Sequence, residues 1–122
     1  MATRTHQLYV DEVQCHFIAE EQVLFPAARR FAELAPLVLE LGGEHERLRE
    51  YFLRAQRQTL DQGGLQDFWK LLTGHIRKEE RLLFEGLQKQ LTQDEMKLLG
   101  AALAGALKDA ARVCRLGSSQ AL

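Results

Sequence analysis

A short pattern occurs twice in the chain and limits its possible folds more than any other feature does. The pattern is H-x-x-x-E-E-x-x-L-F; it covers positions 16–25 and returns at positions 75–84. On an α-helix, side chains four residues apart lie one turn above each other, so His16 pairs with Glu20 and His75 pairs with Glu79. Two helices that each present an imidazole beside a carboxylate are suited to hold metal.

Both copies lie on apolar stripes at helical spacing, which places the two carboxylates toward the interior. The first stripe consists of Val13, Phe17, Glu20 and Leu24, and the second of Phe68, Leu72, His75, Glu79 and Leu82. Neither stripe contains a lysine or an arginine. A buried carboxylate without a cationic partner costs several kcal/mol or takes up a proton, and a bound divalent cation removes that cost. The alternative is two ordinary, partly exposed pairs that happen to look alike.

A third histidine, His45, lies on an apolar stripe of its own. The other members of this stripe are Val38, Leu41, Leu48, Phe52 and Ala55. Judged alone, His45 would be an ordinary core residue. Similar intervals, each about one helix plus a loop, separate the three histidines, so an antiparallel bundle would bring them to a similar depth. We therefore expect three helices to converge on one metal site.

The expected fold is all-α: an antiparallel helical bundle of three ligand-bearing helices and a C-terminal helix. The 122 residues and 46% hydrophobic content suit one core. We therefore expect a single domain over residues 1–116 and a flexible tail over residues 117–122. The helices should cover residues 5–30, begin again at Pro36, cover residues 65–89 and begin a last time near Thr92, with a kink at Pro26 and a loop over residues 61–64.

Charge and hydropathy exclude several classes of partner. The net charge is −1 and the pI is about 6.4, so no basic patch favours nucleic acid. No run is long enough to span a membrane and the amino terminus lacks a secretory apolar core, so we expect a cytoplasmic protein without a membrane partner. Cys15 and Cys114 lack metal-site spacing. Cys15 is expected to be a small buried apolar residue, with a redox-sensing thiol as the alternative.

The segments HFIAEEQVLFP, EHERL and HIRKEERLLF resemble the hemerythrin HHE cation-binding domain, over about residues 14–90. The resemblance implies a helical bundle around a non-haem di-iron centre, in which two carboxylates bridge the metals and histidines complete the coordination. Carried over position by position, it assigns as ligands His16, Glu20, His45, His75 and Glu79.

The sequence departs from the family in two places. Family members have a further helix, with another histidine, before the first H-x-x-x-E helix, and only residues 1–15 precede His16 here, so that helix is expected to be missing. Leu41 stands one turn before His45, where the oxygen-carrying members have a second histidine. Solvent could fill the vacant position, a single metal could bind, the C-terminal helix could cover the gap, or a second chain could lend a helix. We expect a homodimer, because an exposed apolar seam generally finds a partner.

Imidazole and carboxylate ligands without thiolate fit iron, and also manganese or zinc. Two irons are expected, chiefly from the resemblance. Three glutamates adjacent to the expected ligands, Glu21, Glu44 and Glu80, are expected at the solvated surface or in contact with ligands rather than on the metal.

The leading functional hypothesis is a protein that binds or senses dioxygen, or a related small oxidant such as nitric oxide or peroxide, at a non-haem di-iron site. An apolar layer would keep the site dry; its members are Phe17, Leu24, Leu48, Phe52, Leu72 and Leu83. No nucleophile and base define a substrate pocket, so an enzyme is not expected, although oxidase or peroxidase side activity stays open. The alternatives are a degenerate helical module for dimerisation or partner docking, and an iron store or scavenger.

Overall fold

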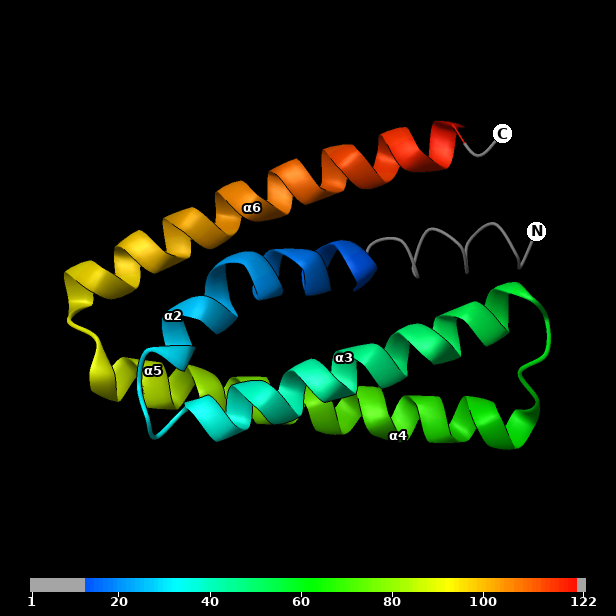
Figure 1. Cartoon of the computed structure of the whole chain (residues 1–122), viewed down its shortest axis with the longest axis horizontal. Helices are drawn as coiled ribbons and strands as arrows, with labels where there is room; N and C mark the ends of the chain where they lie inside the picture. The colour runs from blue at the N-terminus through cyan, green and yellow to red at the C-terminus, as the bar shows by residue number, and fades with distance from the viewer. Residues whose placement is uncertain (1–12, 121–122) are drawn as a thin grey trace. The chain divides into compact units, whose positions relative to one another are not determined.

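The computed structural model describes the backbone of residues 13–120 and the side chains of residues 13–112 (Figure 1). Helices make up all the regular structure within these residues, and no strand occurs among them. The all-α fold class is therefore confirmed. None of the described helices is long and apolar enough to cross a membrane.

The described residues form two compact units, one from residues 28–92 and the other from residues 13–27 together with 93–120. The single domain expected over residues 1–116 stays a prediction. Residues 5–12 of the expected first helix lie outside the described residues.

The unit of residues 28–92 contains two antiparallel helical rods (Figure 1). The first rod is α3 (Ala35–Gln56), with Pro36 in its first turn as predicted. The second rod is continuous and consists of α4 (Gln62–Lys78), η2 (Glu79–Phe84) and α5 (Glu85–Gln90). Gly42 and Gly43 do not interrupt α3, because the rods pack along its whole apolar stripe.

The connection between α3 and α4 lies earlier in the chain than the sequence predicts. Gln58 has a left-handed backbone with φ 58°, and α4 already begins at Gln62. Asp61 caps α4, since its Oδ1 accepts a hydrogen bond of 2.7 Å from the backbone N–H of Gly64. The prediction of a loop over residues 61–64 is therefore wrong. Two glycines alone would not favour the start of a helix here, but an aspartate at the N-cap position stabilises it.

The core of this unit is built from the stripes that the sequence predicts. Phe52 of α3 meets Phe68 of α4 edge-on, with ring centroids 5.5 Å apart. The largest fully buried apolar side chains of the unit are Leu41, Leu48, Phe52, Leu83 and Leu87. Two histidines of the same unit, His45 and His75, are buried as completely as these apolar side chains.

The other unit pairs the first described helix with the last. The first helix consists of α-helical residues 13–19, η1 (Glu20–Leu24) and the start of α2 (Phe25–Arg29). The last helix, α6 (Gln93–Gln120), packs along η1 and begins directly after Thr92, as the predicted capping box requires. Helix α6 continues through positions 117–120, where a flexible tail is expected, and residues 121–122 lie outside the described part.

The duplicated sequence pattern produces a duplicated backbone feature. Both copies switch from α-helix to a wider π-helical segment, and the switch occurs at Glu20 in η1 and at Glu79 in η2. In η1 the backbone N–H of Phe25 donates to the carbonyl of Glu20, five residues back. Helical structure therefore continues through Pro26, which the sequence predicts to be a kink. The second copy has no proline, so proline alone does not cause the π-helical segment.

Candidate metal centre

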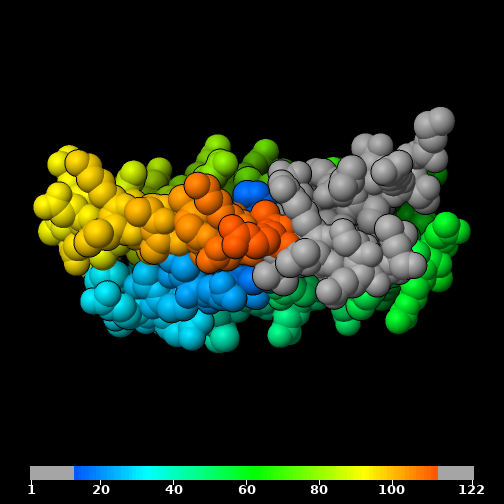
Figure 2. Space-filling view, turned by 90° about the horizontal axis from the view of Figure 1, so that it is seen from above, coloured from blue at the N-terminus to red at the C-terminus, as the bar shows by residue number. Residues whose placement is uncertain are grey.

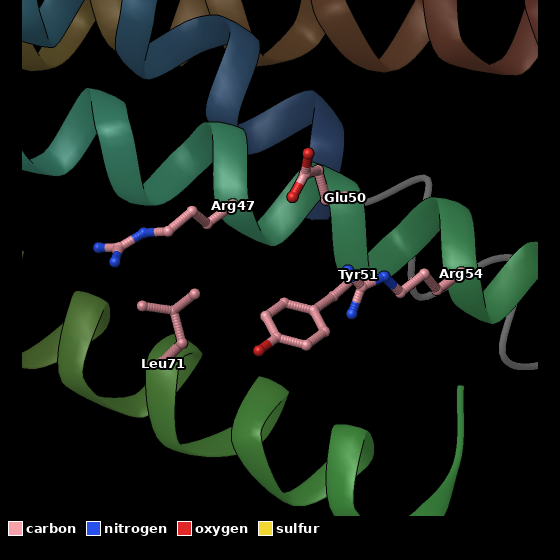
Figure 3. Close-up of a pocket in the computed structure, with 5 residues that line it drawn as sticks. All are labelled: Arg47, Glu50, Tyr51, Arg54 and Leu71. Atoms are coloured by element: carbon pink, nitrogen blue, oxygen red, sulfur yellow. The ribbon is translucent and has the colours of Figure 1, made fainter. Parts of the chain in front are cut away.

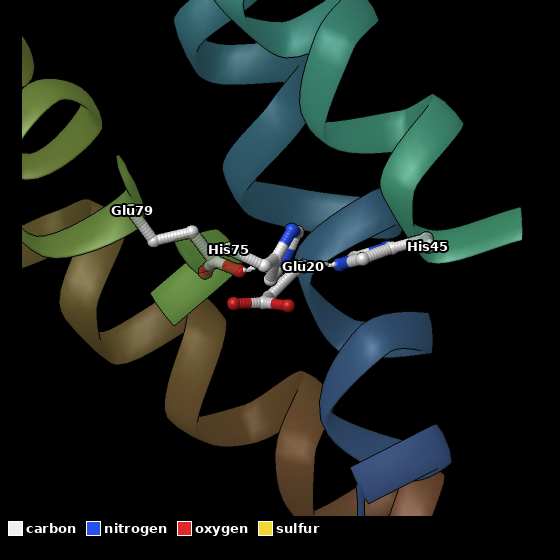
Figure 4. Close-up of side chains that lie close together, drawn as sticks. All are labelled: Glu20, His45, His75 and Glu79. Atoms are coloured by element: carbon white, nitrogen blue, oxygen red, sulfur yellow. Dashed lines mark hydrogen bonds and ion pairs between the residues drawn. The ribbon is translucent and has the colours of Figure 1, made fainter. Parts of the chain in front are cut away.

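Two buried histidines meet between the two rods of the 28–92 unit. His45 of α3 is 0% exposed and His75 of α4 is 1% exposed. Their Nε2 atoms lie 2.9 Å apart, and their ring centroids are 4.6 Å apart at an angle of 47°. Figure 4 shows the two rings approaching each other from different helices. Two imidazole nitrogens that face one point in a dry core are the arrangement expected of metal ligands.

A carboxylate joins the two histidines. Glu79 opens η2 one turn after His75, and it is 7% exposed. Its Oε1 contacts Nε2 of His75 and lies 3.9 Å from Nε2 of His45. The three side chains each offer one ligand atom, and these atoms lie within 4.8 Å of one another. The 28–92 unit therefore holds three groups that could bind one cation.

A second carboxylate, Glu44, contacts the far side of the His75 ring. It is 3% exposed, and its Oε1 accepts a hydrogen bond of 2.9 Å from Nδ1 of His75. Its other oxygen, Oε2, accepts from Nζ of Lys78, which also donates to Oε1 of Glu40 at 2.9 Å. A chain of contacts thus runs from the histidine to a lysine and a carboxylate at the surface.

The charges in this chain of contacts are mutually stabilising. Burial by itself would raise the pKa of Glu44, but hydrogen bonds from Lys78 and His75 outweigh it, and the pKa of Glu44 lies below its usual value. Hydrogen bonds to Glu40 and Glu44 raise the pKa of Lys78. Glu44 is therefore an anion and Lys78 a cation at neutral pH.

The family model of the hemerythrin HHE cation binding domain matches residues 2–87. The chain belongs to this family. Its all-helical structure agrees with a hemerythrin-like helical bundle, and its buried histidine and glutamate side chains agree with a cation-binding role. Neither the curated proteins nor the solved structures include a match to the chain.

Five ligands are predicted for this HHE domain, and the structure brings three of them together in one unit. These three are His45, His75 and Glu79. His16 and Glu20 belong to the other unit, where His16 is exposed and Glu20 is partly exposed. Coordination of metal by each of the five residues remains a prediction.

The π-helical segment changes the register of the second apolar stripe. The sequence places Leu82 on the stripe with Glu79, but Leu82 is 55% exposed and Leu83 is fully buried. A π-helical turn contains more residues than an α-helical turn, so side chains beyond Glu79 rotate by about one position. The stripe continues through Leu83 and Leu87 instead.

Sequence reasoning did not separate Glu44 from the other glutamates beside the ligands. Glu80 is exposed and Glu21 is partly exposed, whereas Glu44 is buried against His75. One signal was available. Glu40 and Glu44 lie one turn apart on α3, and like charges at this spacing repel unless a cation lies between them. Lys78 is that cation.

Cys15 is buried, as the sequence predicts, with 5% of its surface exposed. It is disulfide-bonded, however, so the alternative of a free redox-sensing thiol does not describe this structure.

A separate hollow of about 240 Å³ opens on the surface between α3 and α4 (Figure 3). It is lined by Arg47, Glu50, Tyr51, Arg54 and Leu71. The guanidinium of Arg54 lies 5.7 Å from the centre of the Tyr51 ring. None of the five predicted ligands lines this hollow, and its two guanidinium groups repel cations. It is therefore distinct from the candidate metal centre.

Proposed function

We propose that the chain binds two iron ions at this centre and uses them to bind or sense dioxygen or a related small oxidant, such as nitric oxide or peroxide. One observation carries the proposal: two imidazoles and a carboxylate, all buried, converge on one point. Burying these groups costs free energy that a cation between them would offset.

The ligand chemistry supports iron. Imidazole nitrogen and carboxylate oxygen without a thiolate suit iron, and manganese or zinc are the alternatives. Iron bound there would supply an open coordination position and a change of oxidation state. The residues of the chain would fix the ligand atoms, keep water away and hold the proton on the outer nitrogen of each imidazole.

We propose that Glu20 and His16 complete the site, with Glu20 and Glu79 bridging the two ions. The support is that both glutamates occupy the same place in the repeated sequence pattern and both open a π-helical segment. Segments of this kind occur frequently at functional sites. Equivalent local backbones would present two carboxylates in equivalent ways.

The residues of the predicted apolar layer are all buried. All of its members have at most 3% of their surface exposed: Phe17, Leu24, Leu48, Phe52, Leu72 and Leu83. An apolar environment of this kind limits solvent access to a metal and so influences its redox behaviour. This supports reversible binding of a small molecule in preference to turnover of a larger substrate.

The proposed function is tested by metal analysis of protein purified from iron-replete cells, with absorption spectra recorded before and after exposure to oxygen. About two irons per chain, with charge-transfer bands that respond to oxygen, are expected. Glu79→Ala should lose the metal, while Glu80→Ala, a change at the exposed neighbouring glutamate, should retain it. An intact helical fold without metal would overturn the proposal.

The second candidate function is a degenerate module for dimerisation or docking. The exposed position of His16 and the presence of Leu41 one turn before His45 favour it. The buried Glu79 disfavours it, because a site without metal would be more stable with an apolar residue there.

Iron storage is a further alternative, and it differs from sensing in how easily the metal exchanges. Challenge of the metal-loaded protein with a chelator would measure this exchange.

We also propose that the chain forms a homodimer through α6. Figure 2 draws α6 in yellow to orange, and Leu98 on this helix is 71% exposed. A dimer would cover such apolar surface. Sedimentation equilibrium should give twice the chain mass, and Leu98→Glu should shift the protein toward monomer. A monomer at all concentrations would exclude this interface.

A further inference from the structure

We propose that Glu44 is a positioning residue that keeps a proton on Nδ1 of His75 and so reserves Nε2 of that ring for the metal. The inference deepens the proposed function and rests on it. It assigns a role to a buried carboxylate that is not itself among the expected ligands.

The geometry places the two nitrogens of His75 in different surroundings. Nδ1 is 2.9 Å from Oε1 of Glu44. Nε2 faces the opposite way, toward Nε2 of His45 at 2.9 Å and toward the carboxylate of Glu79. A carboxylate can only accept hydrogen bonds, so a short contact with Glu44 requires Nδ1 to carry the proton. By the same rule Nε2 donates to Glu79 while no metal is bound. A metal at Nε2 would replace that proton, and Glu44 would keep the other proton on Nδ1.

The position of Glu44 is itself fixed by a second contact. Its two oxygens have separate partners, because Oε1 meets His75 and Oε2 meets Lys78. Lys78 lies on the same helix as His75 and also donates to Glu40, which lies one turn before Glu44 on α3. Lys78 and His75 together therefore hold the Glu44 carboxylate from both sides. Histidine ligands in proteins commonly have such a carboxylate behind them, which fixes both tautomer and ring orientation.

Glu44 is unsuited to act as a ligand in its present place. Both of its oxygens are engaged on the side of His75 that faces away from His45 and Glu79. Glu44 also has a cationic partner in Lys78, whereas the carboxylate of Glu79 contacts Nε2 of His75. The two buried glutamates of the 28–92 unit thus have different roles.

The discriminating variant is Glu44→Gln. Lys78 offers only donors, so the new amide oxygen should face Lys78 and the amide NH2 should face His75. Nδ1 of His75 must then accept and carries no proton, so the one remaining ring proton lies on Nε2, the atom that the metal needs. The double variant Glu44→Gln with Lys78→Met frees the amide to turn its oxygen back toward His75. The double variant should therefore recover the proton on Nδ1 that the single variant loses. A general loss of stability would not give this recovery, because a second substitution would then only add to the damage.

The first readout needs no metal. Two-bond proton–nitrogen correlation spectra of the metal-free full chain at neutral pH report which nitrogen of His75 is protonated; its signals are assigned by their loss in His75→Asn. We expect Nδ1 to be protonated in the wild type, unprotonated in Glu44→Gln and protonated again in the double variant. The control, Glu46→Gln, changes an exposed glutamate on the same helix and should match the wild type.

The second readout is iron(II) affinity measured without oxygen. Glu44→Gln should bind about ten- to a hundredfold more weakly, with partial recovery in the double variant and no change in Glu46→Gln. An unprotonated Nδ1 in the wild type would overturn the proposal, and so would a protonated Nδ1 with unchanged affinity in Glu44→Gln. Failure of every variant and of the wild type to bind iron would overturn the proposed function alone, because the nitrogen spectra would still decide the role of Glu44.

Discussion

The Nε2 atoms of His45 and His75 lie 2.9 Å apart although their residues belong to different antiparallel helices. A metal ion bound by both nitrogens needs about 2.0–2.1 Å to each of them. The two rings therefore need to separate only slightly to admit an ion, and the packed helices already aim them. The arrangement is pre-organised for metal before any metal binds.

Iron binding should stabilise the fold. The ligand atoms are assembled only in the folded chain, so iron(II) at a hundredfold excess over its Kd should add about 2.7 kcal/mol to the free energy of unfolding. Thermal denaturation without oxygen, with and without a chelator, measures the shift. Glu79→Ala should remove most of it. An equal shift in this variant would exclude Glu79 as a ligand.

Substitution of each glutamate in the duplicated pattern should separate bridging from surface residues. Glu20→Ala and Glu79→Ala should each abolish loading of two metals, since both carboxylates are proposed to bridge. Glu21→Ala and Glu80→Ala, at the adjacent positions, should retain it. Metal analysis of the four variants gives the comparison, and equal metal content in all of them would contradict the assignment.

Much of the helical core could be predicted from spacing alone. The stripe through His45 is buried as expected from Val38 to Phe52, because a regular α-helix keeps residues at helical spacing on one face. His75 and Phe68 follow the same rule. Where the helix stays regular, the sequence is sufficient to identify the buried face.

The features that sequence could not supply depend on tertiary contacts. A π-helical turn has no simple residue signature, so the exchange of Leu82 for Leu83 on the buried face was not predictable from periodicity. The burial of Glu44 depends on Lys78, which lies on another helix. The exposure of His16 was not predicted either. Its neighbours Cys15 and Phe17 are buried, and which side of this helix is covered depends on the helix that packs against it.

The register of η2 can be tested by a matched pair of substitutions. Leu83→Ala removes a fully buried side chain and should cost about 2–5 kcal/mol of unfolding free energy. Leu82→Ala changes a side chain that is 55% exposed and should cost less than about 1 kcal/mol. Urea denaturation of the two metal-free variants makes the comparison. The reverse order of stability would mean that the helix stays α-helical through Glu79 in solution.

The ion pair of Glu44 and Lys78 should make stability depend on pH in a defined direction. The pKa of Glu44 is lowered in the folded chain, so its contribution is present above the usual glutamate pKa and is lost as pH falls through the folded value. The pKa of Lys78 is raised, so its contribution is present below the usual lysine pKa and is lost as pH rises through the folded value. The pair therefore stabilises the fold across the neutral range and fails at both extremes.

Lys78→Met should reveal this dependence. At neutral pH the variant leaves Oε2 of the buried Glu44 without its lysine donor and should lose about 1–3 kcal/mol. The loss should shrink in acid, where protonated Glu44 no longer needs a cation, and also in strong alkali, where wild-type Lys78 becomes neutral. Urea denaturation of metal-free wild type and variant across pH measures the difference. Lys70→Met, at an exposed lysine on the same helix, should show little loss at any pH. A constant deficit for Lys78→Met would mean that Lys78 stabilises the fold through its apolar stem, because packing of methylene groups does not depend on pH.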